Sequence, residues 1–470
     1  MIGSGPNGLA GAITLAQAGF EVEVHEAEET IGGGARTQEL TLPGFRHDTC
    51  SAIHPLGEAS PVFRRLGLPI EWIHPPAAAA HPFDDGTAIT LERDLGATAS
   101  QLGGDGSAYR RLFGPLVEAW RQIEPVLVGP YPPSRRTLYE LAATLGPVGL
   151  ARAAAASLAA GRPLAESQFA STHARGFFGG HAAHSMLPLE RRPSAGFGLT
   201  LIVLGHVVGW GFPRGGAQAI PDALAERLRS LGGEIRTSSP VDELPRADIV
   251  LADVAPRELL RLGGDLLPAR YAAALRRFRH GPGAFKLDWA LNAPIPWRAD
   301  VCRRAGTVHL GGTLAEIASS EWDAWRGAHS ARPFVLLAQN SVFDGTRAPP
   351  GKHTAWAYCH VPNGSTTDMT EAVEAQVERF APGFRDLVLA RSAMFPADLE
   401  ARNRNLVGGD VGGGANDLAQ LLLRPVRRPI PYRTPLRGVY VCSSSTPPGA
   451  GVHGMSGYAA ARVALKDRGR

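Results

Sequence analysis

Cysteine is scarce in this sequence, and its cysteines are not clustered. Cys50, Cys302, Cys359 and Cys442 are far apart in the 470 residues and form no CxxC pair. This spacing argues against a dithiol redox centre and against a zinc knuckle. Few, scattered cysteines are typical of a reducing compartment, so we expect a cytoplasmic protein that binds no metal.

Three further features are missing: a signal-like opening segment, a long basic run and an apolar stretch that could span a bilayer. The 48 Lys and Arg residues nearly balance the 44 Asp and Glu residues, so the formal net charge is only +4. This balance argues against a nucleic-acid partner. The longest apolar runs, 199–208 and 153–160, are too short to cross a membrane but long enough to touch one.

What the sequence does contain is a dinucleotide-binding pattern at its start. The segment GSGPNG at 3–8 fits GxGxxG, a helical pattern follows at 9–18, and an alternating strand ends at Glu26. Glycines let the backbone approach a pyrophosphate at a helix N-terminus, and the acid accepts ribose hydroxyls. The alternative is a plain glycine turn. The pattern predicts dinucleotide contacts from Gly3, Gly5, Pro6, Asn7, Gly8, Glu26 and Ala27.

The strand that should precede this turn is almost absent, because only Met1 and Ile2 come before Gly3. Either the true N-terminus lies upstream of Met1, or the protein lacks most of its central first strand. We favour the first explanation, since losing a central strand leaves its neighbours with unpaired backbone groups.

A second glycine-rich segment follows the ribose acid and indicates FAD rather than NAD. Glycines at 32–34 let the chain pass over a diphosphate while the cation that follows reaches it. A flexible loop is the alternative. This segment predicts cofactor contacts from Gly33, Gly34, Ala35, Arg36 and Thr37.

Four blocks of the sequence resemble the phytoene-desaturase-like branch of the glutathione-reductase-type flavoproteins. Within that branch, the resemblance is greatest to the group of pyridine nucleotide-disulfide oxidoreductase domain-containing protein 2. The blocks are GSGPNGLAGA at 3–12, GGGARTQELTLPGFRHDTCSAIHP at 32–55, GWGFPRGGAQAIPDAL at 209–224 and YVCSSSTPPGAGVHGMSGYAAA at 440–461.

The resemblance implies a second cofactor motif near the C-terminus. It assigns Ser443 and Ser444 to the ribityl side of the flavin and Val241 to the position beside adenine. It also implies that Val452, His453, Gly454 and Met455 lie near the isoalloxazine ring. A strand, glycine turn and helix N-terminus form an anion-binding arrangement by their geometry as well. Related desaturases often carry Gly or an acid where this chain has Ser443 and Ser444.

The expected fold class is α/β, with a glutathione-reductase-type FAD-binding Rossmann-like domain and a discontinuous mixed α+β substrate (cap) domain. We assign 1–75, 205–255 and 425–470 to the FAD-binding domain, and 76–204 and 256–424 to the cap. The patterns predict helices over 138–160, 217–231, 370–380 and 454–466, and strands over 284–291 and 334–339.

Catalytic candidates are the polar residues expected to return beside the flavin ring. His453, His54 and Asp48 are the candidates, with Ser51 nearby, and a structural hydrogen bond is the alternative for each. Asp410 is a weaker candidate, because the glycine-dense segment 403–414 approaches the flavin in relatives.

Other polar residues are interpreted more plainly. His173, His181, His184 and His206 are spaced too loosely for a metal. Lining of a substrate pocket is a better interpretation than a metal site, and ordinary polar surface is favoured over both. Lys286 and Asp288 are interpreted as a solvated strand face, and the alternative is a lysine buried near the flavin that holds a water. Asp344 and Arg347 are not placed.

These observations predict a non-covalent FAD enzyme of the dehydrogenase or desaturase type. It would transfer a hydride to flavin from an apolar, amphipathic or carbonyl-containing small molecule. Alternatives are an oxidase that passes electrons to O₂, and a flavin-bound interaction protein with little turnover. We expect non-covalent binding because no residue is placed for attachment: Cys50 and Cys442 lie beside the expected flavin positions rather than at them. The helix over 138–160, with flanking arginines, is either an ordinary packed helix or a peripheral membrane contact.

Overall fold

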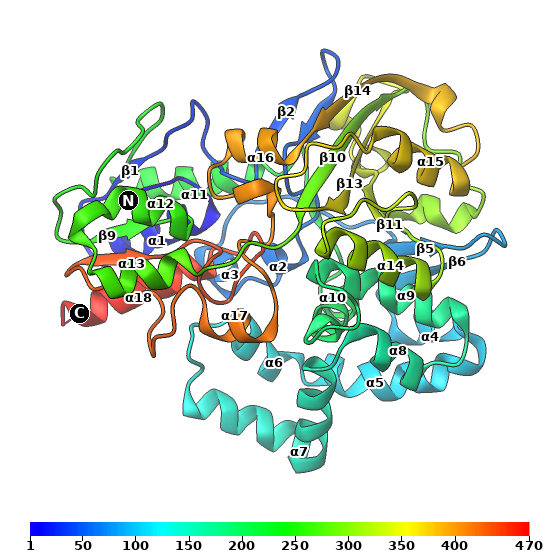
Figure 1. The fold of residues 1–470 in the computed structure, drawn as a ribbon, viewed down its shortest axis with the longest axis horizontal. Coiled ribbons are helices and arrows are strands. Elements are labelled where there is room, and N and C mark those ends of the chain that lie inside the picture. Colours follow the sequence, from blue (N-terminus) through cyan, green and yellow to red (C-terminus); the bar gives the residue numbers. More distant parts are fainter. Residues whose placement is uncertain (470) are drawn as a thin grey trace.

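A small parallel sheet carries the dinucleotide-binding motif. The computed structural model describes residues 1–469. In this sheet β1 (Glu23–His25) pairs with β8 (Glu234–Arg236), and β9 (Val250–Ala252) pairs with β15 (Val439–Val441), all in parallel. Segments from the start, middle and end of the sequence therefore build one domain, on the left in Figure 1.

The central position of this sheet is filled by Ile2. It forms parallel bridges with His25 on one side and Ala252 on the other, and so connects the two strand pairs. The Ile2 amide donates to Leu251 O at 2.9 Å, and the Asp253 amide donates to Ile2 O at 2.9 Å. Met1 and Ile2, the two residues before the glycine turn, therefore hydrogen-bond to the strands on both sides of them, at the edge of the sheet that faces the turn.

Three helices pack around this sheet at close range: α1 (Pro6–Gln17), α11 (Ala219–Ser230) and α18 (Met455–Asp467). A Cβ added to Gly457 would lie 1.7 Å from the carbonyl oxygen of Asn7, and one added to Gly8 would lie 2.2 Å from that of Gly3. Glycine at both positions lets α1 approach α18 and its own preceding turn.

The second domain is built on a mixed seven-stranded sheet. All its neighbouring strands are antiparallel except β11 and β5, which are parallel. Its strand order is β14 (Val388–Met394), β10 (Gly283–Leu291), β13 (His353–Val361), β12 (Val335–Ala338), β11 (Ala305–Leu310), β5 (Ala77–Pro82) and β6 (Ala88–Glu92).

Two hydrophobic clusters cover this sheet. One contains Phe113, Phe177 and Leu204 and joins helices to β5 and β6. The other contains Trp289 and Phe380 and joins the sheet to α15 (Thr370–Phe380). The helices of the first cluster are α4 (Leu95–Gln101), α5 (Gly106–Glu118), α6 (Trp120–Leu127), α8 (Gly161–Gln168), α9 (Thr172–Ala182), α10 (Ser194–Val207) and α14 (Leu314–Trp325).

Short elements complete the chain. The β2 (Thr37–Glu39) and β3 (Arg46–Asp48) strands form a hairpin, and β4 (Trp72–Ile73) pairs with β7 (Phe212–Pro213). The remaining helices are α2 (Pro55–Glu58), α3 (Pro61–Leu66), α7 (Arg135–Ser157), α12 (Pro256–Gly263), α13 (Ala269–Arg276), α16 (Pro396–Arg402) and α17 (Leu418–Leu423).

The observed architecture is the predicted α/β class with a Rossmann-like domain and a mixed second domain. One part of the predicted division differs. Helices α12 and α13, assigned from the sequence to the cap, pack through Leu259, Leu262 and Tyr271 on Val250 and Val439 of the parallel sheet. Their apolar faces are covered by the first domain, so this segment lies with it.

Helix α7 projects from the far end of the second domain (Figure 1). None of its residues is fully buried; Ala153 and Ala156 pack partly against the domain core, while Leu138, Tyr139 and Val148 are exposed. Throughout residues 1–469, no helix combines the length and the apolar character needed to cross a membrane.

Candidate dinucleotide site

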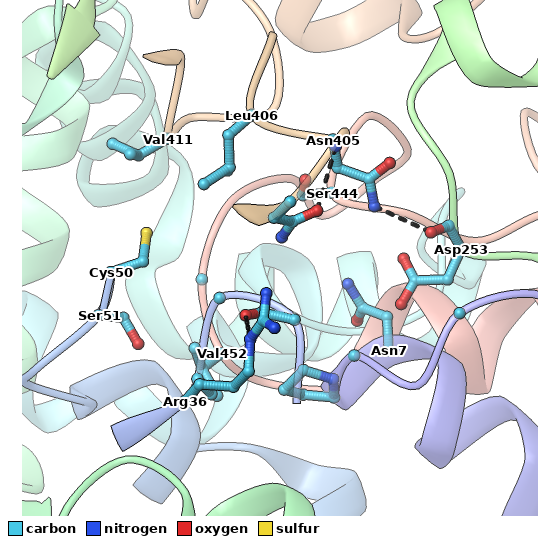
Figure 2. A pocket seen from close by; sticks show the side chains of 18 of the residues that line it. Asn7, Arg36, Cys50, Ser51, Asp253, Asn405, Leu406, Val411, Ser444 and Val452 are labelled. Carbon is cyan, nitrogen blue, oxygen red and sulfur yellow. Dashed lines mark hydrogen bonds between the residues drawn. The ribbon is translucent and has the colours of Figure 1, made fainter. Parts of the chain in front are cut away.

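Both domains contribute walls to a cavity of about 410 Å³. One end is lined by the glycine turn, Glu26 and the segment 239–241, and the other end by side chains of the second domain. Figure 2 shows the middle of this cavity, where segments near 36, 50, 253, 405, 444 and 452 converge. The two N-terminal motifs found in the sequence thus line one continuous space.

The N-terminus of α1 opens into this cavity without a side-chain cap. Gly5 is the N-cap residue, Pro6 follows it, and no acidic residue lies in the first turn. Asn7 lines the cavity, and its Oδ1 is buried without a hydrogen-bond partner among the described residues. Asp253 accepts the amide of Gly8, the third residue of this helix, but the positive end of the helix dipole still favours an anion in front of the first turn.

Glu26 lies beside the turn and is held in place by it. Its Oε2 accepts hydrogen bonds from the Ser4 amide (2.9 Å) and the Ser4 hydroxyl (2.6 Å), and its Oε1 accepts one from the Glu28 amide (3.0 Å). The side chain also lines the cavity. Because each carboxylate oxygen can accept two bonds, Glu26 retains acceptor capacity for a ligand hydroxyl.

Arg36 is fixed at the cavity wall by two carbonyl groups. Its Nε donates to Gly33 O at 2.9 Å, and a terminal nitrogen donates to Arg402 O. Figure 2 shows the guanidinium beside the glycine turn. A guanidinium held in this way presents a fixed positive charge to an anion in the cavity.

Asp253 supports the turn from the opposite side. Its Oδ2 accepts the Gly8 amide at 2.9 Å, and a Cβ on Gly5 would lie 2.9 Å from the same oxygen. Asn405 donates to Asp253 O at 2.9 Å (Figure 2). Burial raises the pKa of Asp253 to about 7, and the nearby Glu26 charge acts in the same direction.

The other end of the cavity is apolar and aromatic. Its walls include no carboxylate, and the polar groups there are a thiol, hydroxyls, the indole nitrogens of two tryptophans and two imidazoles. The lining side chains at this end are Cys50, Ser51, His54, Leu56, His184, Leu201, Trp210, Thr307, Leu336, Trp356 and Tyr358. Such a chamber suits a largely apolar molecule.

The structure brings most of the sequence-predicted cofactor residues to this cavity. Those that line it are Gly3, Gly5, Pro6, Asn7, Glu26, Ala27, Gly33, Gly34, Ala35, Arg36, Val241, Ser444 and Val452, together with the catalytic candidate His54. Those outside the lining are Gly8, Thr37, Asp48, Ser443, His453, Gly454 and Met455.

His453 lies behind the loop that lines the cavity. Its Nδ1 accepts the Met455 amide at 3.0 Å, its Nε2 contacts Gly449 O at 3.3 Å, and its own carbonyl accepts the Ser60 hydroxyl at 2.6 Å. Burial lowers its pKa to about 4. In this position the imidazole fixes the start of α18.

His54 lines the cavity and has a free nitrogen. Its Nε2 is 2.8 Å from the Ser51 hydroxyl, and its Nδ1 is buried without a partner among the described residues. Burial lowers its pKa to about 4, so the ring is neutral at neutral pH.

Asp48 lies in a buried ion pair next to the cavity wall. It accepts from Arg347 at 2.7 Å, Thr37 at 2.7 Å and the Ala217 amide at 2.8 Å. Burial acts to raise the pKa of Asp48, but Arg347 and these hydrogen bonds outweigh it and hold the pKa below the usual value. Arg347, which the sequence left unplaced, is its partner, and Asp344 accepts the Gly215 amide.

The sequence predicted that Lys286 and Asp288 lie on a solvated strand face, and this prediction is wrong. Both are buried, and they form an ion pair with each other. Burial lowers the pKa of Lys286 and raises that of Asp288 to about 6. The alternation of β10 was misleading because both faces of its sheet are covered.

The histidines of the second domain also differ from the surface interpretation. His181 and His206 are buried. His184 lines the cavity, which agrees with the pocket-lining interpretation. His173 is on the surface and contacts Asp85. Asp410 does not line the cavity, because its carboxylate accepts the amides of neighbouring glycines.

Several lining residues were missed from the sequence. They come from three places: the loop 402–406, the strand end at 253–254, and Trp210, Trp356 and Tyr358. The glycine-dense segment at 403–414 was the one available signal, and it pointed to Asp410 rather than to the residues just before it.

Comparisons with known proteins agree with this geometry. Residues 1–66 match the NAD(P)-binding Rossmann-like domain model. The chain is 26% identical to mouse pyridine nucleotide-disulfide oxidoreductase domain-containing protein 2, over 99% of this chain and 93% of the relative. It is 27% identical to phytoene dehydrogenase of Streptomyces griseus, over 83% of this chain and 77% of the relative.

Two solved structures share the fold at lower identity. A Methanosarcina mazei oxidoreductase matches with a TM-score of 0.67 and 16% identity, covering 99% of both chains. Putrescine oxidase bound to putrescine matches with a TM-score of 0.61 and 18% identity, covering 100% of this chain and 98% of the other. These two structures confirm the predicted fold class, and the two relatives named above confirm the predicted resemblance.

Proposed function

We propose that this chain, an FAD-dependent oxidoreductase similar to the phytoene-desaturase-like flavoproteins, binds one FAD non-covalently and takes a hydride from an apolar or amphipathic small molecule. One observation carries the proposal. A single cavity runs from the N-terminus of α1 and a ribose-type acid to an aromatic chamber without carboxylates. The first end suits a dinucleotide and the second suits an apolar substrate.

The residues present fit FAD. In this proposal the α1 N-terminus and Arg36 hold the diphosphate, Glu26 accepts ribose hydroxyls, and Val241 lies beside adenine. The unpartnered Oδ1 of Asn7 is free to accept from the cofactor. Ser444 and Val452 would face the ribityl chain and the ring, while Ser443, His453, Gly454 and Met455 would shape the loop from behind. Bound flavin supplies the acceptor for a hydride.

Non-covalent binding is supported by the state of Cys50, the cysteine that lines the cavity. Burial raises the pKa of its thiol to about 11. The thiolate is the reactive nucleophile of cysteine, so Cys50 is a poor attachment residue at neutral pH.

The substrate class follows from the chamber and from the relatives. Relatives include a phytoene dehydrogenase and, over 26% of this chain, a limonene dehydrogenase subunit, and both names refer to hydrocarbons. An amine substrate is disfavoured because no carboxylate lines the aromatic end to pair with a cation. His54 is the proposed polar group beside the reacting carbon.

The test is anaerobic reduction of the purified chain's flavin by terpene hydrocarbons, with putrescine and NADPH as comparison donors. The proposal expects bleaching of the flavin bands with an apolar donor only. Reduction by putrescine would favour the amine-oxidase class. Fast reoxidation in air would favour the oxidase alternative, and no reduction by any donor would favour an interaction protein.

We further propose a cytoplasmic protein whose α7 touches a membrane surface. The exposed Leu138 and Tyr139 lie beside the exposed Arg135 and Arg136 in the first half of α7, and the exposed Val148 follows the kink at Gly146. An apolar patch next to arginines is typical of helices that bind anionic lipid surfaces.

A further inference from the structure

Behind the cofactor wall of the cavity lies a buried arginine that no ion pair neutralises. Arg424 directly follows α17, and it is only 1% exposed. Among residues 1–469, no carboxylate oxygen lies within 4.0 Å of its guanidinium nitrogens, and its Nε is buried without a hydrogen-bond partner. Burying a cation without an ionic partner is costly, which points to a role for this charge beyond packing.

The guanidinium contacts two segments that contribute to the cavity wall. Nη1 donates to Ser444 O at 3.2 Å, and Nη2 donates to Ala415 O at 3.3 Å and to Asn416 Oδ1 at 3.0 Å. Ser444 lines the cavity (Figure 2), and a Cβ on Gly449 would lie 3.0 Å from Nη1. The charge is therefore one residue away from the space in which we propose that the flavin binds.

Two carboxylates act on Arg424 from beyond contact distance, and both are already bonded elsewhere. Asp410 accepts three backbone amides, and Asp417 forms an ion pair with Arg279 at 2.7 Å. Burial lowers the pKa of Arg424 to about 10, although both carboxylates act to raise it. The guanidinium is therefore charged at neutral pH, and its charge is not cancelled by a neighbour in contact with it.

We propose that Arg424 supplies the positive charge that stabilises the reduced state of the bound flavin. The inference rests on the proposed function. In that function a C–H bond of the donor breaks with its electron pair, the flavin gains one hydrogen and one negative charge, and the donor loses a second hydrogen as a proton to water. A fixed cation close to the flavin, in a region that water does not reach, lowers the free energy of the state that carries the negative charge.

The competing explanation is that Arg424 only holds the two wall segments together. Arg424→Gln removes the charge and keeps one NH₂ donor, whereas Arg424→Lys keeps the charge and loses the forked donors. Asn416→Asp leaves the arginine in place and puts a carboxylate oxygen where the amide oxygen now lies, 3.0 Å from Nη2. This third variant neutralises the charge while the acceptor for Arg424 is retained.

The experiment measures the midpoint potential of the flavin bound to the full chain, by equilibration with a reference dye. We expect Arg424→Gln and Asn416→Asp each to lower the equilibrium constant for reduction about tenfold or more, which is about 30 mV for a two-electron couple. Arg424→Lys should stay within about threefold of wild type, because it keeps the charge, while its thermal midpoint falls because the forked contacts are lost.

The matched control is Arg427→Gln. Arg427 is three residues further along the chain, carries the same charge and is exposed. Solvent and salt screen a charge at the surface, so its removal should change the equilibrium constant less than about twofold.

The outcomes separate the role of the charge from the proposed function. Unchanged potentials in Arg424→Gln and Asn416→Asp would overturn this inference and leave the flavin enzyme intact. An equal drop in Arg424→Lys and Arg424→Gln, with no drop in Asn416→Asp, would also overturn it, because the contacts alone would then be responsible. If Arg424→Gln does not fold, the Asn416→Asp potential decides. A chain that binds no FAD would contradict the proposed function itself, before any variant is compared.

Discussion

At the scale of single residues, two carboxylates lie at the proposed cofactor end of the cavity, Glu26 and Asp253, and they are suited to different protonation states. Glu26 is bonded by backbone and hydroxyl donors and retains acceptor capacity, whereas Asp253 is buried with one amide donor to its carboxylate. Glu26 is therefore suited to accept from a ribose. Asp253 is suited to remain protonated beside an anion.

Glu26→Gln should weaken FAD binding by about 1.5–3 kcal/mol, because it removes a charge-assisted acceptor for ribose. The measurement is the FAD dissociation constant from fluorescence on dilution. Glu29→Gln is the control, because Glu29 is exposed and does not line the cavity. Wild-type retention of FAD by Glu26→Gln would contradict the ribose assignment.

Asp253 gives a prediction about pH. Its pKa is raised to about 7 in the folded chain, so the folded state keeps a proton that an unfolded aspartate loses near pH 4. Folding stability from this group is complete below pH 4 and is lost as the pH rises to about 7. Asp253→Asn should therefore gain on the order of 2–4 kcal/mol relative to wild type between pH 4 and pH 8.

Urea unfolding of both proteins at the two pH values measures this difference. The asparagine still offers an oxygen to the Gly8 amide, so the loop should remain in place. A stability difference that does not change with pH would show that Asp253 is already ionised.

The positions of individual residues were predictable from the sequence where a motif specifies the backbone conformation. They were less predictable where the position depends on whether the side chain is buried. Glycine spacing and Glu26 predicted residues that line one end of the cavity. Lys286 and Asp288 could not be placed, because local alternation does not reveal that a strand is covered on both faces. The position of His453 depends on the loop fold, which turns its ring toward the Met455 amide.

At the scale of elements, the close contact of α1 with α18 is the most demanding feature of the first domain. Gly457→Ala would place a Cβ 1.7 Å from Asn7 O, so it should destabilise the chain by about 1–3 kcal/mol or more. Thermal unfolding measures the loss. Gly149→Ala in α7, whose Cβ would meet only ordinary contacts, should be neutral or stabilising by up to about 1 kcal/mol.

Helix α7 gives the second prediction at this scale. The chain should float with vesicles that contain anionic lipid at low salt, and less at moderate salt, because screening weakens the arginine contribution. Replacing Leu138 and Tyr139 together by Glu should abolish flotation without changing thermal stability, since both side chains are exposed. Wild-type protein that stays at the bottom in both salts would leave α7 without a membrane role.

Long periodic elements were well predicted. The helix expected over 370–380 is α15 (Thr370–Phe380), and the strand expected over 284–291 is β10 (Gly283–Leu291). Short strands such as β4 and β7 were not predicted, because pairing across distant segments gives no local pattern.

At the scale of the whole molecule, the cavity exists because the chain returns several times to the same place. Residues near 36, 53, 210, 253, 356, 405 and 452 share its walls. The sequence predicted this return for the two cofactor motifs, whose spacing is characteristic. It did not predict which second-domain side chains close the far end, because that depends on how the seven-stranded sheet meets the parallel one.

The proposed function depends on this cavity holding FAD. The most direct measurement is the flavin content of the purified chain, from the absorbance of the filtrate after denaturation and ultrafiltration. We expect released FAD at about one per chain. A colourless chain that takes up no added FAD, or pigment that stays with the denatured protein, would contradict it.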